Sequence, residues 1–170
     1  MDKAALKIVI EAVKKAIITE LRGYEIYKAA AEKTTDPDAK RMFESLASDE
    51  RAHKDFLEKN YQGLLQKGEW TVPATAENLT PDDHSEIITG DFLQRVKGGE
   101  FEMAVIAAGV ELERSAIEFY RAQASACPDE KARVTFHFLA DWEKGHLESL
   151  SELEKTMRDQ YFAERGFSPM

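Results

Sequence analysis

The sequence predicts an all-α protein, a four-helix bundle in which a long crossover joins two antiparallel helix pairs. Three observations support this fold class. Apolar residues recur at steps of three and four over most of the 170 residues. Helix-breaking triplets that contain aspartate and proline divide the chain at residues 36–38 and 127–129. Glycine and proline gather in residues 61–98, which lie between the two predicted pairs.

The first helix pair is predicted over residues 2–60. Its first helix carries an apolar stripe at helical spacing, formed by Leu6, Ile10, Val13, Ile17, Leu21 and Tyr24. Asp36 followed by Pro37 is typical of a helix start, with an N-cap side chain before a proline in the first turn. The second helix is expected to end near Asn60 to Gly63.

Residues 61–98 are predicted to be the crossover, with a short helix within residues 85–97. They contain four of the nine glycines and two of the five prolines. If each pair is an antiparallel hairpin, this segment must return along the length of the bundle. A helix of about 24 residues is about 36 Å long. The 38 residues of the segment, at up to ~3.3 Å each, can cover that distance.

The second helix pair is predicted over residues 99–162. Its first helix should begin after Gly98-Gly99 and run to about Ala126, and its second should run from about Asp129 to Phe162. The tail, residues 163–170, is expected to be irregular. A length of 170 residues is enough for one hydrophobic core, so a single domain over the whole chain, 1–170, is expected.

The composition excludes several function classes. With 23 basic and 32 acidic residues, the net charge is −9, which argues against nucleic acid or an anionic membrane as the main partner. The apolar run 104–110 is too short to span a bilayer, and no secretory signal is visible, so a cytoplasmic protein is expected. The single cysteine, Cys127, excludes an internal disulfide and a cysteine-based zinc or rubredoxin-type iron site.

An internal repeat singles out the residues that carry chemistry. Residues 16–57 align with residues 109–150 without a gap, at an offset of 93, and 13 of the 42 positions are identical. Helical composition inflates matches of Ala, Leu and Glu. The informative matches are polar, because two of only four histidines coincide, each three residues after a matched glutamate and 33 after another. The matched polar residues are Glu20/Glu113, Tyr27/Tyr120, Glu50/Glu143 and His53/His146.

The helical register places these polar residues inside the bundle. Leu46, Glu50, His53 and Leu57 follow one another at steps of four, three and four, and Leu139, Glu143, His146 and Leu150 repeat the pattern. A glutamate and a histidine on the same stripe as flanking leucines should face the interior. Glu20 and Glu113 share stripes with apolar residues of their own helices. Four carboxylates and two imidazoles are therefore predicted to meet at mid-bundle.

Such a cluster predicts a dinuclear metal site. Burying four ionised carboxylates without compensation would cost far more than the net stability of a domain. Two divalent cations carry four positive charges, and oxygen-rich ligation with one imidazole per metal suits Fe, Mn and, less specifically, Zn. The alternative, surface glutamates beside two histidines with ordinary partners, would suit a single Glu-x-x-His motif. It explains neither the repeat nor the leucine register.

At these residues the sequence resembles the rubrerythrin and ferritin-like diiron-carboxylate superfamily, over residues 5–62 and 100–160. The resemblance implies a ferritin-like bundle holding two Fe ions, with Mn or Zn as alternatives. The implied metal ligands are Glu20, Glu50, His53, Glu113, Glu143 and His146, with Glu50 and Glu143 bridging. Tyr27 and Tyr120 look like tyrosines that hydrogen-bond ligand carboxylates. Core tyrosines whose hydroxyls reach other polar groups would give the same sequence pattern.

Three positions depart from the family pattern or stay open. Rubrerythrins carry an additional carboxylate where this chain has Ala116, which matches Gly23 in the first half. They usually also carry a rubredoxin module with paired C-x-x-C motifs, which Cys127 alone cannot supply. Asp49, just before Glu50, could orient a ligand histidine, or could be an exposed aspartate.

The resemblance implies a diiron oxidoreductase that reduces hydrogen peroxide or dioxygen in defence against oxidative stress. Its electrons would come from an external donor such as a rubredoxin-like protein, and a homodimer is expected. Two alternatives remain open at this point. One is a ferroxidase or iron-binding protein in iron handling, and the other is a metal-stabilised structural or regulatory helical module.

Overall fold

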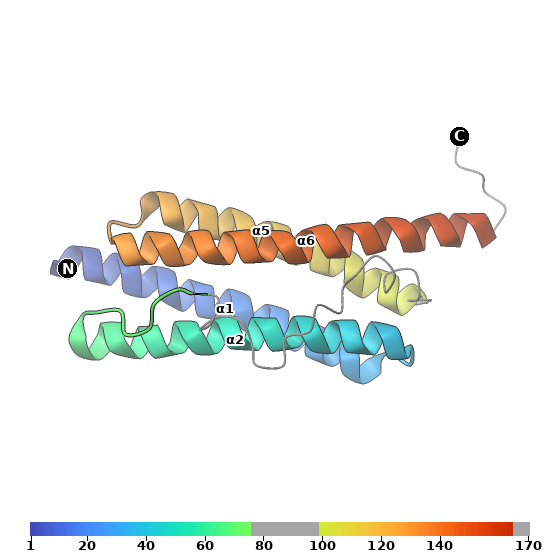
Figure 1. Ribbon diagram of the computed structural model, residues 1–170, viewed down its shortest axis with the longest axis horizontal. Coiled ribbons are helices and arrows are strands. Elements are labelled where there is room, and N and C mark those ends of the chain that lie inside the picture. Colours follow the sequence, from blue (N-terminus) through green and yellow to red (C-terminus); the bar gives the residue numbers. More distant parts are fainter. Residues whose placement is uncertain (76–98, 165–170) are drawn as a thin grey trace.

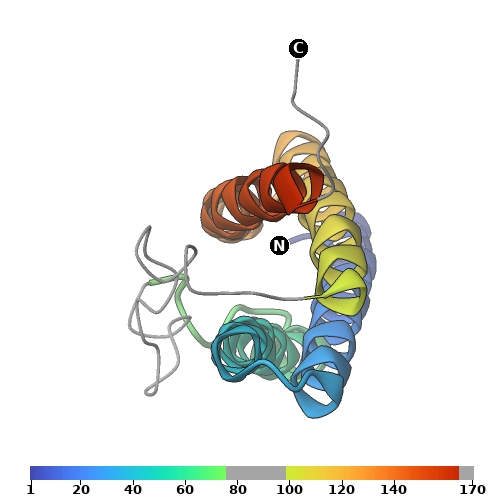
Figure 2. The same ribbon diagram turned by 90° about the vertical axis from the view of Figure 1, so that its right-hand side faces the viewer.

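The computed structural model describes residues 1–75 and 99–164, and these ranges contain four helices and no strand. Helix α1 spans Lys3–Lys33, α2 Pro37–Lys67, α5 Glu100–Ala126 and α6 Glu130–Glu164. Helix α1 packs along α2, and α5 along α6, while α1 also contacts α5. The four run roughly along one axis (Figure 1), and the view from the end shows them as two pairs (Figure 2). The predicted ferritin-like bundle of two helix pairs is confirmed.

The helix directions are those that a long crossover requires. Helix α2 ends where α1 begins, and α5 begins at the opposite end of the bundle (Figure 1). Helices α2 and α5 therefore run in the same direction. The short helix predicted within residues 85–97 and the tail beyond residue 164 lie outside the described residues. Among the helices that are described, none is long and apolar enough to cross a membrane.

Aspartate side chains cap the second helix of each pair, as the sequence predicts for Asp36. Oδ1 of Asp36 accepts a hydrogen bond from the Asp38 amide at 2.9 Å, and Pro37 occupies the first turn. Oδ1 of Asp129 accepts one from the Ala132 amide at 2.9 Å. The same oxygen accepts a bond from Nε1 of Trp70 at 2.9 Å, which ties the chain after α2 to the start of α6.

Helix α2 continues beyond the predicted end near Asn60 to Gly63, so that expectation is wrong by about one turn. The helix ends at Lys67, and Gly68 follows in the left-handed conformation with φ 69°. Asn60 does not break the helix, because its Oδ1 accepts hydrogen bonds from the amides of residues 71 and 72 at 3.0 Å each. A Cβ on Gly63 would lie 2.4 Å from Cγ2 of Thr71. Asn60 and Gly63 therefore do not end the helix, but allow the chain that follows α2 to pack back against it.

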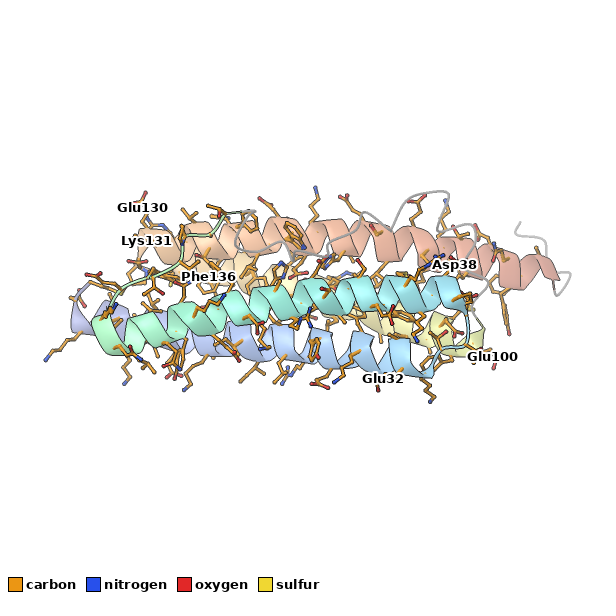
Figure 3. The ribbon with its side chains drawn as sticks, turned by 60° about the horizontal axis from the view of Figure 1, so that its bottom comes forward. Glu32, Asp38, Glu100, Glu130, Lys131 and Phe136 are labelled. Atoms are coloured by element: carbon orange, nitrogen blue, oxygen red, sulfur yellow. The ribbon has the colours of Figure 1, made fainter. Side chains whose placement is uncertain are left out.

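The core consists of two apolar clusters, one toward each end of the bundle. One cluster includes Val13, Phe56, Leu57, Tyr120, Phe136 and Leu139. The other includes Tyr27, Phe43, Leu46, Ile106, Leu150 and Leu153. Figure 3 labels Phe136, which is fully buried, and Glu130 and Lys131, which are exposed at the start of α6. On every helix, polar residues separate the two clusters at mid-length.

Candidate metal centre

Six polar side chains from all four helices meet between the two apolar clusters. They are the six that the repeat singles out: Glu20 from α1, Glu50 and His53 from α2, Glu113 from α5, and Glu143 and His146 from α6. Each is at most 7% exposed. Leucines one turn away on α2 and α6 are fully or almost fully buried, in the register that the sequence predicts.

The side chains form two overlapping groups of potential metal ligands. We call Glu20, Glu50, His53 and Glu143 the His53 position, and Glu50, Glu113, Glu143 and His146 the His146 position. Within each group the ligand atoms lie within 4.8 Å of one another. Glu50 and Glu143 belong to both positions, whereas each of the other four side chains belongs to one.

Each imidazole directs Nδ1 toward the carboxylates of its position. In the His53 position, Nδ1 of His53 lies 3.2 Å from Oε2 of Glu20 and 3.4 Å from Oε1 of Glu143. In the His146 position, Nδ1 of His146 lies 2.9 Å from Oε2 of Glu143 and 3.9 Å from Oε1 of Glu50. The rings themselves are 6.5 Å apart between centroids and tilted by 27°. Nδ1 is therefore the atom that each histidine would offer to a cation.

Two buried tyrosines connect the helix pairs across the site. The hydroxyl of Tyr27 on α1 donates to Oε1 of Glu113 on α5, and the hydroxyl of Tyr120 on α5 donates to Oε1 of Glu20 on α1. Both tyrosines are fully buried, and each belongs to a different apolar cluster. The two clusters therefore each extend one phenol into the site, where it fixes the orientation of a carboxylate in the other helix pair.

Four buried polar atoms at this site have no hydrogen-bond partner among the described residues. They are Oε1 of Glu50, Nε2 of His53, Oε2 of Glu113 and Oε1 of Glu143. Leaving a buried polar group without a partner costs about 1–3 kcal/mol, and more for a charged group. Three orphaned carboxylate oxygens in one interior cluster fit a cation that would bind them. The donor set, oxygen-rich with one imidazole per position, is one that Fe or Mn prefers.

Protonation partly balances the charge of the carboxylates when no metal is bound. Burial raises the pKa of Glu50 well above its ordinary value, and the neighbouring Glu143 raises it further. For Glu113, burial and then the charge of Glu143 raise the pKa to about 8. Burial alone would also raise the pKa of Glu143, but its contacts with His146 and His53 outweigh burial and lower it well below the ordinary range. Glu143 is therefore ionised at the centre of the site.

The histidines hold protons that a metal would displace. Burial alone would lower the pKa of His53, but the contacts with the Glu143 and Glu20 carboxylates outweigh it and raise the pKa to about 9. For His146, Asp49 and Glu143 likewise outweigh burial and raise the pKa well above the ordinary value. Metal ligation requires a neutral imidazole, so cations and protons compete for the same atoms.

Asp49 is a site residue that the sequence left undecided. It is 3% exposed, and its Oδ2 lies 3.1 Å from Nε2 of His146. The signal available in the sequence was its spacing, because Asp49 lies three residues after the buried Leu46 and four before His53. Its counterpart in the repeat is Trp142, so the repeat itself obscured it.

A glycine on α1 leaves space for the Glu50 carboxylate, which both positions share. A Cβ added to Gly23 would lie 2.6 Å from Cδ of Glu50, closer than side chains can approach. The counterpart of Gly23 in the second half is Ala116, which packs in an apolar cluster. No additional carboxylate therefore reaches the site from either position.

Neither His137 nor Cys127 is part of the cluster. His137 is exposed on α6, and His84 lies outside the described residues. Cys127 is buried in an apolar cluster, and burial is the largest cause that raises the pKa of its thiol. A low-pKa redox thiol is therefore not found at this position.

Comparison with known proteins agrees with this geometry. The family model described as Rubrerythrin matches residues 11–154. The match covers well over half of the chain and all six clustered side chains, so the chain belongs to the rubrerythrin family. No curated protein and no solved structure matches the chain significantly.

Proposed function

We propose that this member of the rubrerythrin family is a non-haem diiron oxidoreductase that reduces hydrogen peroxide, or more slowly dioxygen. The observation that carries the proposal is the buried set of four glutamates and two histidines with its orphaned carboxylate oxygens. Two ferrous ions held there would supply one electron each to a peroxide, which takes up two protons and leaves as two water molecules.

The protein side chains divide the work of holding the metal pair. Glu50 and Glu143 belong to both positions and would bridge the two ions. Glu20 and Glu113 belong to one position each and would bind at the two ends, where the hydroxyls of Tyr120 and Tyr27 fix one oxygen of each. Burial raises the pKa of both phenols well above the ordinary value, so they remain hydrogen-bond donors.

The surroundings of the site favour reduction of a small oxidant. The apolar clusters on both sides exclude bulk water, so reactive oxygen species are confined to the space between the helices. Cys127, the one cysteine of the sequence, lies in an apolar cluster and outside the site. We propose that electrons for a further turnover come from a donor such as a rubredoxin-like protein.

The test is anaerobic loading with Fe(II), followed by stopped-flow mixing with peroxide and with dioxygen in parallel. We expect oxidation by peroxide to be much faster than by dioxygen, and we expect Glu50→Gln to lose the fast phase. Glu58→Gln is the matched control, because Glu58 lies on the same helix with its side chain 52% exposed. Equal rates for wild type and Glu50→Gln would contradict the proposal. Uptake of many irons per chain, with Fe(II) as the preferred substrate, would instead indicate iron handling.

A further inference from the structure

The two halves of the repeat differ at the residue that precedes each Glu-x-x-His motif. The first half has Asp49 at this place and the second half has Trp142. In the bundle each of them lies against the histidine of the other half. Asp49 contacts His146, and Trp142 contacts His53. Equivalent histidines therefore have chemically different neighbours.

At His146 both ring nitrogens have partners with defined roles. Nδ1 lies 2.9 Å from Oε2 of Glu143, and Nε2 lies 3.1 Å from Oδ2 of Asp49. With a metal at Nδ1, the proton of the neutral imidazole resides on Nε2, which then donates to Asp49. A carboxylate that accepts this proton fixes the tautomer and the ring orientation, and it makes Nδ1 a better ligand.

At His53 the outer nitrogen has no such partner. Nε2 of His53 is buried without a hydrogen bond to any residue that the structure describes. The ring meets the Trp142 indole at right angles, with centroids 5.4 Å apart, and the indole in turn stacks on Phe138. An indole holds the imidazole by contact but offers no anionic oxygen to accept the Nε2 proton. The His53 ring is therefore packed in place without electrostatic support for metal ligation.

We propose that Asp49 is a positioning residue that makes the two metal positions unequal, so that the His146 position binds a divalent cation first and more tightly than the His53 position. The inference rests on the dinuclear site proposed above. Glu50 and Glu143 cannot cause the difference, because they belong to both positions. The terminal carboxylates are alike in accepting one tyrosine hydroxyl each.

The experiment is a titration of the metal-free full chain with Co(II). Calorimetry measures the affinity of each step, and proton NMR shows which histidine binds the metal. A bound Co(II) shifts the Nε2 proton of a ligating imidazole far outside the normal spectral range. The wild type should show one such resonance at one equivalent of Co(II) and two resonances at two equivalents. The first resonance should be lost in His146→Gln and retained in His53→Gln.

Asp49→Asn tests the assigned cause with a side chain of the same shape. Loss of a carboxylate that supports a metal-bound histidine typically costs about 10–100-fold in metal affinity. The tighter Co(II) step should weaken by about that factor, while the weaker step stays within about twofold. Asp141→Asn is the control, because it removes the same charge from an exposed position on α6 and should change neither step. Trp142→Asp should strengthen the weaker step, because it offers His53 the missing acceptor.

Four results would overturn the inference. Two resonances of equal intensity at one equivalent in the wild type would show equal positions. Loss of the first resonance in His53→Gln would show that the His53 position binds the first cation. Unchanged affinity of both steps in Asp49→Asn would show that Asp49 does not cause the difference between the positions. Fewer than two Co(II) per chain at saturation would overturn the dinuclear site as well, whereas two equal sites would overturn this inference alone.

Discussion

The two halves of the bundle, residues 16–57 and 109–150, are alike in what they contribute to the site and unlike in what surrounds it. Each half supplies two glutamates, a histidine and a buried tyrosine, and each tyrosine binds a glutamate of the opposite half. The outer contact of each histidine differs, with a carboxylate at one and an indole at the other. A repeat can therefore duplicate a set of ligands while its surroundings make the two positions chemically distinct.

The largest expected effect tests the shared and unshared roles of the glutamates. Glu50→Gln and Glu143→Gln each alter both positions, so we expect either one to abolish binding of a metal pair. Glu20→Gln and Glu113→Gln each alter one position and should leave a single bound metal. Elemental analysis of metal per chain, after loading and removal of excess metal, measures the difference. If Glu50→Gln still bound two metals, the assignment of a bridging role would be wrong.

The next largest expected effect is on metal affinity, when the residue types at the equivalent positions Gly23 and Ala116 are exchanged. Gly23→Ala would place a methyl group where the Glu50 carboxylate lies, so metal affinity should fall by about 10–100-fold, as when a ligand loses its supporting contacts. Ala116→Gly should lower helix stability by about 1 kcal/mol and leave metal binding unchanged. Gly145→Ala controls for helix propensity, because nothing lies within 4 Å of a Cβ at that position. Equal metal affinity in Gly23→Ala and Gly145→Ala would contradict this account of Gly23.

The tyrosines should behave alike, because their contacts are related by the repeat. Removing the hydroxyl in Tyr27→Phe or Tyr120→Phe leaves a buried carboxylate oxygen without its donor. Each variant should lose about 1–3 kcal/mol in the free energy of unfolding, the usual cost of leaving a buried polar group without its partner. Urea denaturation of the metal-free proteins measures it. Losses that differ by more than about twofold would show that the two tyrosines are not equivalent.

A smaller expected effect is the dependence of the stability of the metal-free protein on pH, to which His53 of the first half and Glu113 of the second half contribute. The pKa of His53 is raised to about 9 and that of Glu113 to about 8. Both groups bind protons more tightly in the folded protein than in the unfolded chain, so their contribution to stability is lost as pH rises through about 8 to 9. Metal-free protein should therefore melt at lower temperature at pH 10 than at pH 7.

The metal-loaded protein should not show this loss, because cations have replaced the protons. Metal binding at pH 7 should accordingly release protons, which calorimetry in buffers of different ionisation enthalpy detects. Melting temperatures that fall equally with pH in both forms would show that these two groups do not titrate at the site.

Much of the fold follows from the sequence, because helical spacing and aspartate caps are local signals. The end of α2 could not be predicted from the sequence, because Asn60 and Gly63 act through contacts with the chain after the helix. The repeat identified the six clustered side chains because residue type and register recur together. The contacts between halves, such as Asp49 with His146, depend on how the helix pairs are rotated against each other. No local pattern encodes that rotation, and the repeat gave no indication of Asp49 because its counterpart is Trp142.

The most direct test of the dinuclear iron site is anomalous diffraction at the iron edge from crystals loaded with Fe(II) under anaerobic conditions. The account predicts two iron peaks per chain, about 3.5–4 Å apart, lying between Glu50 and Glu143. The peak at the His146 position should persist when iron is limiting. A single peak at saturating iron, peaks confined to the surface, or no peak at all would contradict it.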